Sequence, residues 1–281
     1  MELEILRGIQ SIANPFFDFI FQLFTVFGEE LIIIPFLTII YWGYDKKLGE
    51  YVGFSVFTSL LLNNSMKDIF KFKRPIGEEG IRSLRVNTAT GYSFPSGHSQ
   101  GAAAFYGSVA LYLRKKFIYI ISFAVMFLVG FSRLYLGVHY PKDVLVGLVI
   151  GFFIACISLK LFNSVKNRNI LYIIVFLIFI PFVFFEGSRD LIKSFGSYAG
   201  FILGIFIEKK YINFSNKTNI MSRIIRILIG LVIVFALKIG LKMIFPDKSF
   251  FDFLRYFIMV LFGIGIYPIV FKKIDFSERN K

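Results

Sequence analysis

Long apolar segments alternate with short polar loops along most of the chain. Many apolar runs approach twenty residues, the length that a helix needs to cross the hydrocarbon layer of a membrane. In lipid such segments must be helical, because every backbone polar group needs a partner inside the segment. The pattern therefore predicts an all-α fold, a polytopic membrane bundle of about nine to ten transmembrane helices. The expected spans lie at about 29–44, 49–67, 97–113, 117–136, 142–162, 168–186, 191–208, 221–245 and 251–272, with 16–27 as a tenth if that segment crosses.

The first residues follow a different pattern. Apolar and charged side chains fall on opposite faces over residues 3–13, which predicts a short amphipathic helix at the membrane interface, with a frayed tail as the alternative. Asn14 and Pro15 end that helix, and Gly28 with two glutamates interrupts the apolar run that follows. We therefore expect three regions: N-terminal interfacial or short helices (1–28), a membrane core (29–163) and additional C-terminal transmembrane helices of unknown role (164–281).

Composition agrees with a membrane protein and excludes several other classes. The chain is 56% hydrophobic and holds 38 phenylalanines, which is not the composition of a soluble globular protein. Its net charge of +14 comes mostly from residues that flank apolar segments, so topology and lipid phosphate explain it better than nucleic acid. The single cysteine, Cys156, allows no intramolecular disulfide. The first residues carry two glutamates and lack a basic segment before an apolar one, so no cleaved signal peptide is expected.

Lysine and arginine counts in alternate loops indicate the orientation. Most basic loops fall on one side, which should be cytoplasmic. The polar stretch 68–95 is also basic yet falls on the other side, which suggests that it binds an anion. Spans that end near Lys67 and at 136, and spans that begin near 97 and 142, all meet that extracytoplasmic face. Three polar segments far apart in the sequence are therefore expected to lie together.

These segments supply groups that suit a phosphate. Lys67, Arg74 and Arg133 bring three cations, and guanidinium groups bind phosphate oxygens in a bidentate manner. Ser96 and Gly97 fall at a helix start, where free backbone N–H groups and the helix dipole favour an anion. The alternative for any single cation is an ordinary anchor that reaches toward the membrane surface.

Both histidines of the chain lie in these segments. His98 could donate a proton to a leaving oxygen, and Asp143 follows His139 by about one helical turn, so it could fix the tautomer of that ring. A helix cap is the alternative for His98. A metal site is less well supported, because no third histidine exists and the loop that carries Glu78 and Glu79 reads as solvated. No metal ion or cofactor is expected.

Three motifs in this order resemble the signature of the type 2 phosphatidic acid phosphatase (PAP2) superfamily. They are KDIFKFKRP at 67–75, PSGH at 95–98 and SRLYLGVHYPKD at 132–143. The resemblance covers about residues 45–163. It implies that His139 is the nucleophile that forms a phosphohistidine, that Asp143 orients it and that His98 is the general acid. The residues that it implies for phosphate binding are Lys67, Arg74, Ser96, Gly97 and Arg133. It also implies metal-independent catalysis at the outer face of the membrane.

The resulting hypothesis is an integral membrane phosphatase, in a bacterial cytoplasmic membrane, whose partners are membrane lipids and a lipid phosphate substrate. An isoprenoid diphosphate, phosphatidic acid and phosphatidylglycerol phosphate all fit. A phosphotransferase that uses the same phosphohistidine is one alternative, and a lipid or anion transporter is another. Within the C-terminal region, Lys238 and Lys242 fall inside an apolar run, and Glu186, Arg189 and Asp190 are expected to pair with one another. That region could shape a lipid groove or form a homodimer interface.

Overall fold

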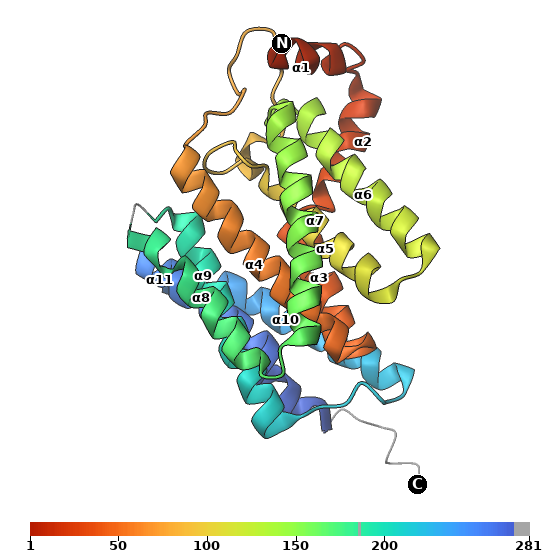
Figure 1. The fold of residues 1–281 in the computed structure, drawn as a ribbon, viewed down its shortest axis with the longest axis vertical. Coiled ribbons are helices and arrows are strands. Elements are labelled where there is room, and N and C mark those ends of the chain that lie inside the picture. Colours follow the sequence, from red (N-terminus) through yellow and green to blue (C-terminus); the bar gives the residue numbers. More distant parts are fainter. Residues whose placement is uncertain (185–186, 273–281) are drawn as a thin grey trace. The chain divides into compact units, whose positions relative to one another are not determined.

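Helices make up the fold that the sequence pattern predicts. The computed structural model describes residues 1–184 and 187–272, and no β-strand occurs within these ranges. The helical elements (Figure 1) are α1 (Glu2–Gln10), α2 (Pro15–Val26), α3 (Glu30–Thr38), η1 (Ile39–Tyr44), α4 (Lys46–Phe70), η2 (Val86–Thr88), α5 (Gly97–Leu113), α6 (Lys116–Tyr135), α7 (Pro141–Ser164), α8 (Arg168–Phe184), α9 (Arg189–Ile207), η3 (Glu208–Ile212), α10 (Ile220–Ile244), α11 (Ser249–Leu261), η4 (Phe262–Ile266) and η5 (Tyr267–Lys272). The helix over 97–113 has the predicted bounds, and most other ends differ by a few residues.

Fewer helices qualify as membrane spans by length and composition than the sequence predicted. Five helices of the described ranges are long and apolar enough to cross a membrane: α6, α7, α9 with η3, α10, and α11 with its continuation. A sixth span would combine α2 with α3 and η1, which are bent by 44° at a break. The predicted count of nine to ten is not confirmed, because α5 and α8 have only 17 residues each and α4 carries several charged side chains.

Two compact units make up the chain. Unit 1 holds residues 1–33 and 58–160, and unit 2 holds residues 34–57 and 161–281. Helix α4 therefore begins in unit 2 and ends in unit 1. All residues of the three motifs belong to unit 1.

Glycines bring α5, α6 and α7 of unit 1 close together. A Cβ atom at Gly147 would lie 2.8 Å from the carbonyl oxygen of Ser96, and one at Gly151 would collide with the carbonyl oxygen of Gln100. Likewise, a Cβ at Gly130 of α6 would lie 2.9 Å from Val144 of α7. Small residues at such spacing let helix backbones approach each other, as in other membrane bundles. The helix starts that carry the motifs are thereby held side by side.

Helix α2 packs on the C-terminal end of α6 within the same unit. The rings of Phe21 and Tyr135 lie 4.4 Å apart, and Phe21 also contacts Phe131 at 5.2 Å. Helix α1 then folds back: Leu6 is fully buried, and the Gln10 amide donates to the carbonyl oxygen of Arg82 at 2.7 Å. The predicted N-terminal helix is thus present and rests on the 79–85 loop.

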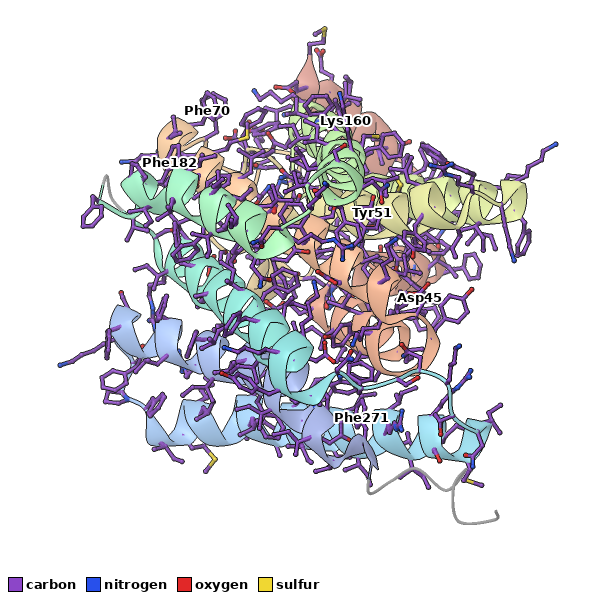
Figure 2. The ribbon with its side chains drawn as sticks, turned by 60° about the horizontal axis from the view of Figure 1, so that its bottom comes forward. Asp45, Tyr51, Phe70, Lys160, Phe182 and Phe271 are labelled. Carbon is purple, nitrogen blue, oxygen red and sulfur yellow. The ribbon has the colours of Figure 1, made fainter. Side chains whose placement is uncertain are left out.

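Unit 2 is centred on a buried tryptophan and on close helix contacts. Trp42 is 1% exposed and donates from Nε1 to the carbonyl oxygen of Gly263 at 3.0 Å. Helices α9 and α11 pack so closely that a Cβ at Gly196 would collide with the carbonyl oxygen of Phe253. Figure 2 labels Phe271, which is buried in this unit and contacts the Trp42 ring at 6.3 Å.

Charged side chains inside unit 2 are paired. Glu50 is 3% exposed and accepts from Tyr172 Oη at 2.7 Å, while Arg168 and Lys209 also contact its carboxylate. Burying such a carboxylate without partners would be costly. This cluster links α4, α8 and η3 within the unit.

Arg189 and Asp190, which the sequence predicted to pair with each other and with Glu186, form ion pairs with other residues. Arg189 Nε donates to Asp252 at 2.6 Å, and its Nη2 contacts Asp247. Asp190 pairs with Lys193 at 2.8 Å, one helical turn further along α9. Glu186 lies outside the described residues. The partners of Arg189 come from α11 and the loop before it, and no local sequence rule specifies that these lie beside α9.

Candidate active site

His139 and Asp143 form the centre of the predicted site, where the α6–α7 junction enters α7. His139 is 1% exposed and Asp143 is fully buried. Nδ1 of His139 lies 3.4 Å from Oδ2 of Asp143. The same carboxylate oxygen accepts from the backbone N–H of Tyr140 at 2.9 Å and from Ser93 Oγ at 2.5 Å. Because Pro141 favours the first turn of α7, the carboxylate is held beside the ring.

Arg74 fixes the tautomer of His139. Its Nη1 lies 2.8 Å from Nε2 of the ring. A guanidinium group has only donors, so Nε2 must be the nitrogen that carries the lone pair, and the ring proton resides on Nδ1 toward Asp143. Burial, together with the cations Arg74, Arg133 and Lys67, holds the pKa of His139 well below its usual value of 6.5. The ring is therefore neutral, with Nε2 available as a nucleophile.

The remaining donors of Arg74 are used by the backbone. Nη1 also donates to the carbonyl oxygen of Val138 at 3.0 Å, and Nε donates to that of Gly91 at 3.0 Å. Nη2 donates to the carbonyl oxygens of Thr90 at 2.6 Å and Tyr92 at 3.1 Å. The predicted phosphate ligand thus also ties the 90–92 loop to the histidine. In this arrangement its five N–H groups all have acceptors.

The start of α5 presents the second motif. Ser96 is fully buried and caps α5, accepting from the backbone N–H of Ser99. The first N–H groups of a helix have no acceptor within it, so the turn at Gly97 is suited to an anion. A Cβ atom at Gly97 would lie 3.6 Å from Nζ of Lys67, which places that ammonium group beside the helix start. The first two motifs therefore meet here.

Arg133 is the deepest cation of the site. It is fully buried near the end of α6, and its Nη1 donates to Thr25 Oγ1 of α2 at 2.8 Å. Its Nε and Nη2 make no hydrogen bond within the described residues. These two groups form one edge of the guanidinium fork, the edge that binds two oxygens of a phosphate. An unpaired buried donor is costly, so this edge is suited to a ligand.

Three residues at this site were not identified from the sequence. Ser93 binds Asp143, and Thr25 binds Arg133, but a serine or threonine in such segments carries no spacing signal of its own. Glu29 lies 3.6 Å from Nε2 of His98 and was interpreted only as a break in an apolar run. A carboxylate inside an apolar run is a functional signal in membrane proteins, so Glu29 could have been recognised.

The described residues hold no group of three or more histidine, cysteine, aspartate or glutamate side chains that could bind a metal ion. The cations instead surround the two histidines. Such a site can bind an anion, offer an imidazole nucleophile and supply a second imidazole for proton transfer.

Comparison with known proteins places this geometry in a family. Residues 49–167 match the model of the PAP2 superfamily, and residues 192–279 match the model of the PAP2 superfamily phosphatase, transmembrane extension. Phosphatidylglycerophosphatase B of Bacillus subtilis is 33% identical over 160 residues, which cover 52% of this chain and 76% of that protein. The chain belongs to the PAP2 superfamily.

Other PAP2 relatives support the assignment. The undecaprenyl-diphosphatase of Sulfolobus acidocaldarius is 29% identical over 146 residues, which cover 51% of this chain and 70% of that protein. The crystal structure of Aquifex aeolicus LpxE superposes with a TM-score of 0.51 at 30% identity, over 57% of this chain and 94% of that chain. This chain is accordingly an integral, multi-pass membrane enzyme of the PAP2 phosphatase type. The site residues predicted from the motifs all lie within 49–167, whereas Thr25 and Glu29 lie before it.

Proposed function

We propose that this protein hydrolyses a lipid phosphomonoester or pyrophosphate through a phosphohistidine on Nε2 of His139. The tautomer carries the proposal: Arg74 donates to Nε2, so the lone pair and not the proton faces away from Asp143. The two relatives named above as a phosphatidylglycerophosphatase and an undecaprenyl-diphosphatase support a lipid phosphate as substrate. The candidates are an isoprenoid diphosphate, phosphatidic acid and phosphatidylglycerol phosphate.

Phosphate binding is the first step. The open edge formed by Nε and Nη2 of Arg133 binds two phosphate oxygens, and Lys67 lies beside the start of α5 to neutralise a third. The turn at Ser96 and Gly97 adds backbone N–H groups. When phosphate enters, the N–H of Arg74 Nη1 that donates to Nε2 of His139 donates to a phosphate oxygen instead. The nucleophile is thereby released at the moment when its target arrives.

Phosphoryl transfer follows in two steps. Nε2 of His139 attacks phosphorus, the bond from phosphorus to the lipid oxygen breaks, and His98 donates a proton to that oxygen. Asp143 stabilises the Nδ1–H of the ring, which becomes positively charged. In the second step His98 accepts a proton from water, the water oxygen bonds to phosphorus, and the bond to Nε2 breaks. The products are the lipid alcohol, or the lipid monophosphate from a pyrophosphate, and inorganic phosphate.

The orientation and the finer topology remain part of the proposal. We place the site at the extracytoplasmic face of a bacterial cytoplasmic membrane, because the cytoplasmic side should receive the other basic loops. Helices α4, α5 and α8 would cross in addition to the spans identified above. The homodimer and the three regions predicted from the sequence remain predictions.

The deciding experiment measures phosphate release from a panel of lipid phosphates by the purified full chain in lipid nanodiscs. We expect release by the wild type and none by His139→Ala. Phosphoenzyme trapped by acid quench should carry phosphate on Nε2 of His139, and phosphate mapped to another residue would refute the mechanism. Phosphorylated acceptor lipid in place of free phosphate would indicate the phosphotransferase. Lipid flux that persists in liposomes with His139→Ala, without turnover, would indicate a transporter.

A further inference from the structure

The break between α2 and α3 lies directly against the start of α5. A Cβ atom at Gly28 would lie 3.0 Å from the carbonyl oxygen of His98 and 3.2 Å from the Cβ of the same residue. Any larger residue would push the break away, so glycine permits this close approach. Tyr106 of α5 strengthens the contact by donating from Oη to the carbonyl oxygen of Phe27 at 3.0 Å. The next residue along the break, Glu29, is therefore held near His98.

Glu29 faces His98 and Arg85 from this position. Oε1 of Glu29 accepts from Nη2 of Arg85 at 2.7 Å and lies 3.6 Å from Nε2 of His98. The side chains of Glu29 and His98 are only 15% and 16% exposed. A separation of 3.6 Å is too long for a hydrogen bond but short enough for an ion pair. Nε2 of His98 makes no hydrogen bond within the described residues, so this nitrogen is available to a ligand.

The same segment reaches a second motif residue. Thr25, one helical turn before Glu29, is fully buried and accepts from Nη1 of Arg133. The broken α2–α3 segment thus contacts both His98 and Arg133, although it precedes the part of the chain that matches the family model. Two independent contacts to the site indicate that this segment belongs to the site.

A general acid at this position needs a counter-charge. Burial first, and then the nearby cations Arg133 and Lys67, disfavour a charged imidazolium at His98, whereas Glu29 favours it. An acid that must protonate an alkoxide leaving group works only when it carries its proton at the start of the reaction. Glu29 is the carboxylate that lies within ion-pair distance of the ring.

We propose that Glu29 is a positioning residue for His98: its carboxylate stabilises the imidazolium form and leaves Nε2–H directed at the leaving oxygen. This inference rests on the proposed phosphatase function. In the first step the proton passes from Nε2 to the lipid oxygen as the bond to phosphorus breaks, and His98 becomes neutral. In the second step His98 takes a proton from the attacking water, and the ion pair with Glu29 forms again.

A purely structural role for Glu29, as the partner of Arg85, makes a different prediction. Loss of packing would slow the reaction with every substrate to a similar degree. Loss of acid catalysis slows only substrates whose leaving group is poor, because a good leaving group departs without a proton. The dependence of the rate on the leaving group therefore separates the two roles.

The experiment compares Glu29→Gln with wild type on two substrates, in the full chain reconstituted in nanodiscs. One substrate is a lipid alkyl phosphate, and the other is p-nitrophenyl phosphate, whose leaving group is good. The quantity compared is kcat/KM, which reports the steps through departure of the leaving group and not the later attack of water. We expect kcat/KM on the lipid phosphate to fall by roughly 10- to 100-fold and kcat/KM on the aryl phosphate to change by less than about threefold. KM should change little, because Arg133 and Lys67 still bind phosphate. His98→Gln should show the same pattern with a larger loss.

Two further variants complete the test. Glu30→Gln is the matched control, because Glu30 is the next residue and is exposed, and it should behave as wild type on both substrates. The double variant Glu29→Gln/His98→Gln should be no slower than His98→Gln alone, because Glu29 acts through His98. Equal losses on both substrates, or a further loss in the double variant, would overturn the inference. So would a Glu29→Gln protein that matches wild type on the lipid phosphate.

The outcomes for the inference and for the proposed function are distinct. A wild type that releases no phosphate from any lipid, or an active His139→Ala variant, refutes the function itself. A wild type that depends on His139 and His98 but is indifferent to Glu29 refutes only the inference.

Discussion

Nη1 of Arg74 donates to Nε2 of His139 at 2.8 Å, and through this contact a cation sets the tautomer of the proposed nucleophile. The other donors of Arg74 hold four backbone carbonyl oxygens of the 90–92 loop and of Val138. One side chain therefore organises the loop that carries Ser93 and keeps the lone pair of the His139 ring on Nε2. Arg74 belongs to the first family motif, and its contacts show that it binds both the His139 ring and the neighbouring backbone.

Replacement of Arg74 by lysine should separate the effect of its positive charge from the effect of its hydrogen bonds. Lysine keeps the positive charge but has three donors on one nitrogen, so it cannot reach the four carbonyl oxygens and the ring together. We expect kcat to fall by roughly 100-fold, the loss typical of a misplaced reacting group. Steady-state kinetics on a lipid phosphate measures it. An Arg74→Lys protein as fast as wild type would show that the carbonyl contacts are dispensable.

The pH dependence should show His139 in its neutral form well into the acid range. Its folded pKa is depressed, first by burial and then by Arg74, so Nε2 stays unprotonated below pH 6.5. The acid limb of kcat/KM, which reports the free enzyme, is therefore expected below pH 6.5. Loss of the cation in Arg74→Gln should move that limb upward, whereas Arg74→Lys should not. Use of one substrate for all three proteins cancels the titration of the substrate phosphate.

The thermal stability of the protein should also depend on the titration of His139, and it should decrease as pH falls. A histidine with a depressed folded pKa is protonated in the unfolded chain first, so its contribution is complete above pH 6.5 and is lost as pH falls toward the folded pKa. We expect the wild type to lose thermal stability over this range more steeply than His139→Gln, which cannot titrate. Thermal unfolding followed by circular dichroism across pH 7 to about 4 measures the difference. Parallel curves would contradict the buried, neutral ring.

Ser93 should matter through Asp143. Its hydroxyl donates to Oδ2 of Asp143 at 2.5 Å in a fully buried setting. Loss of a hydrogen bond to a charged group costs about 1.5–3 kcal/mol, so we expect Ser93→Ala to lower kcat by about tenfold or more. Ser108→Ala is the control, because the buried Ser108 Oγ makes no hydrogen bond within the described residues. A similar loss in both variants would point to general destabilisation.

The approach of α7 to α5 should depend on Gly151. A Cβ there would collide with the carbonyl oxygen of Gln100 and lie 2.8 Å from the Cβ of Ala103. Such overpacking costs about 1–3 kcal/mol, so Gly151→Ala should lower the midpoint of thermal unfolding and reduce activity. Gly240→Ala in α10 is the matched control, because nothing lies within 4 Å of its added Cβ. An unchanged midpoint for Gly151→Ala would contradict the packing.

Chelators should leave the enzyme active. In the proposed mechanism Lys67 and Arg133 neutralise the phosphate charge and a histidine nitrogen is the nucleophile, so no step needs a metal-bound water. We expect phosphate release in EDTA to equal release in its absence. Loss of activity with EDTA that a divalent ion restores would show that a metal takes part.

Local rules account for much that the sequence predicted. Helix starts follow from caps and proline, as at Ser96 before α5 and Pro141 at the start of α7, and helix length follows from the apolar runs. Span parity then predicted that the segments with Lys67, His98 and His139 would meet, and in unit 1 they do. Because these signals depend on neighbours in the sequence, residue order alone was enough to locate them.

Only the tertiary structure decided the rest of the site. The sequence predicted that two histidines, an aspartate and three cations would lie close together, because each falls near the end of a predicted helix and the order of the spans brings those ends together. It did not predict that Thr25 would accept a hydrogen bond from Arg133 or that Glu29 would lie beside His98. Nor did it predict that Arg74 would donate hydrogen bonds to four backbone carbonyl oxygens. Those contacts depend on how closely separate helices approach, which is set by glycines such as Gly28 and Gly151 that contact residues far along the chain. The motifs therefore named the reacting groups, and packing between distant segments determined their hydrogen bonds and charges.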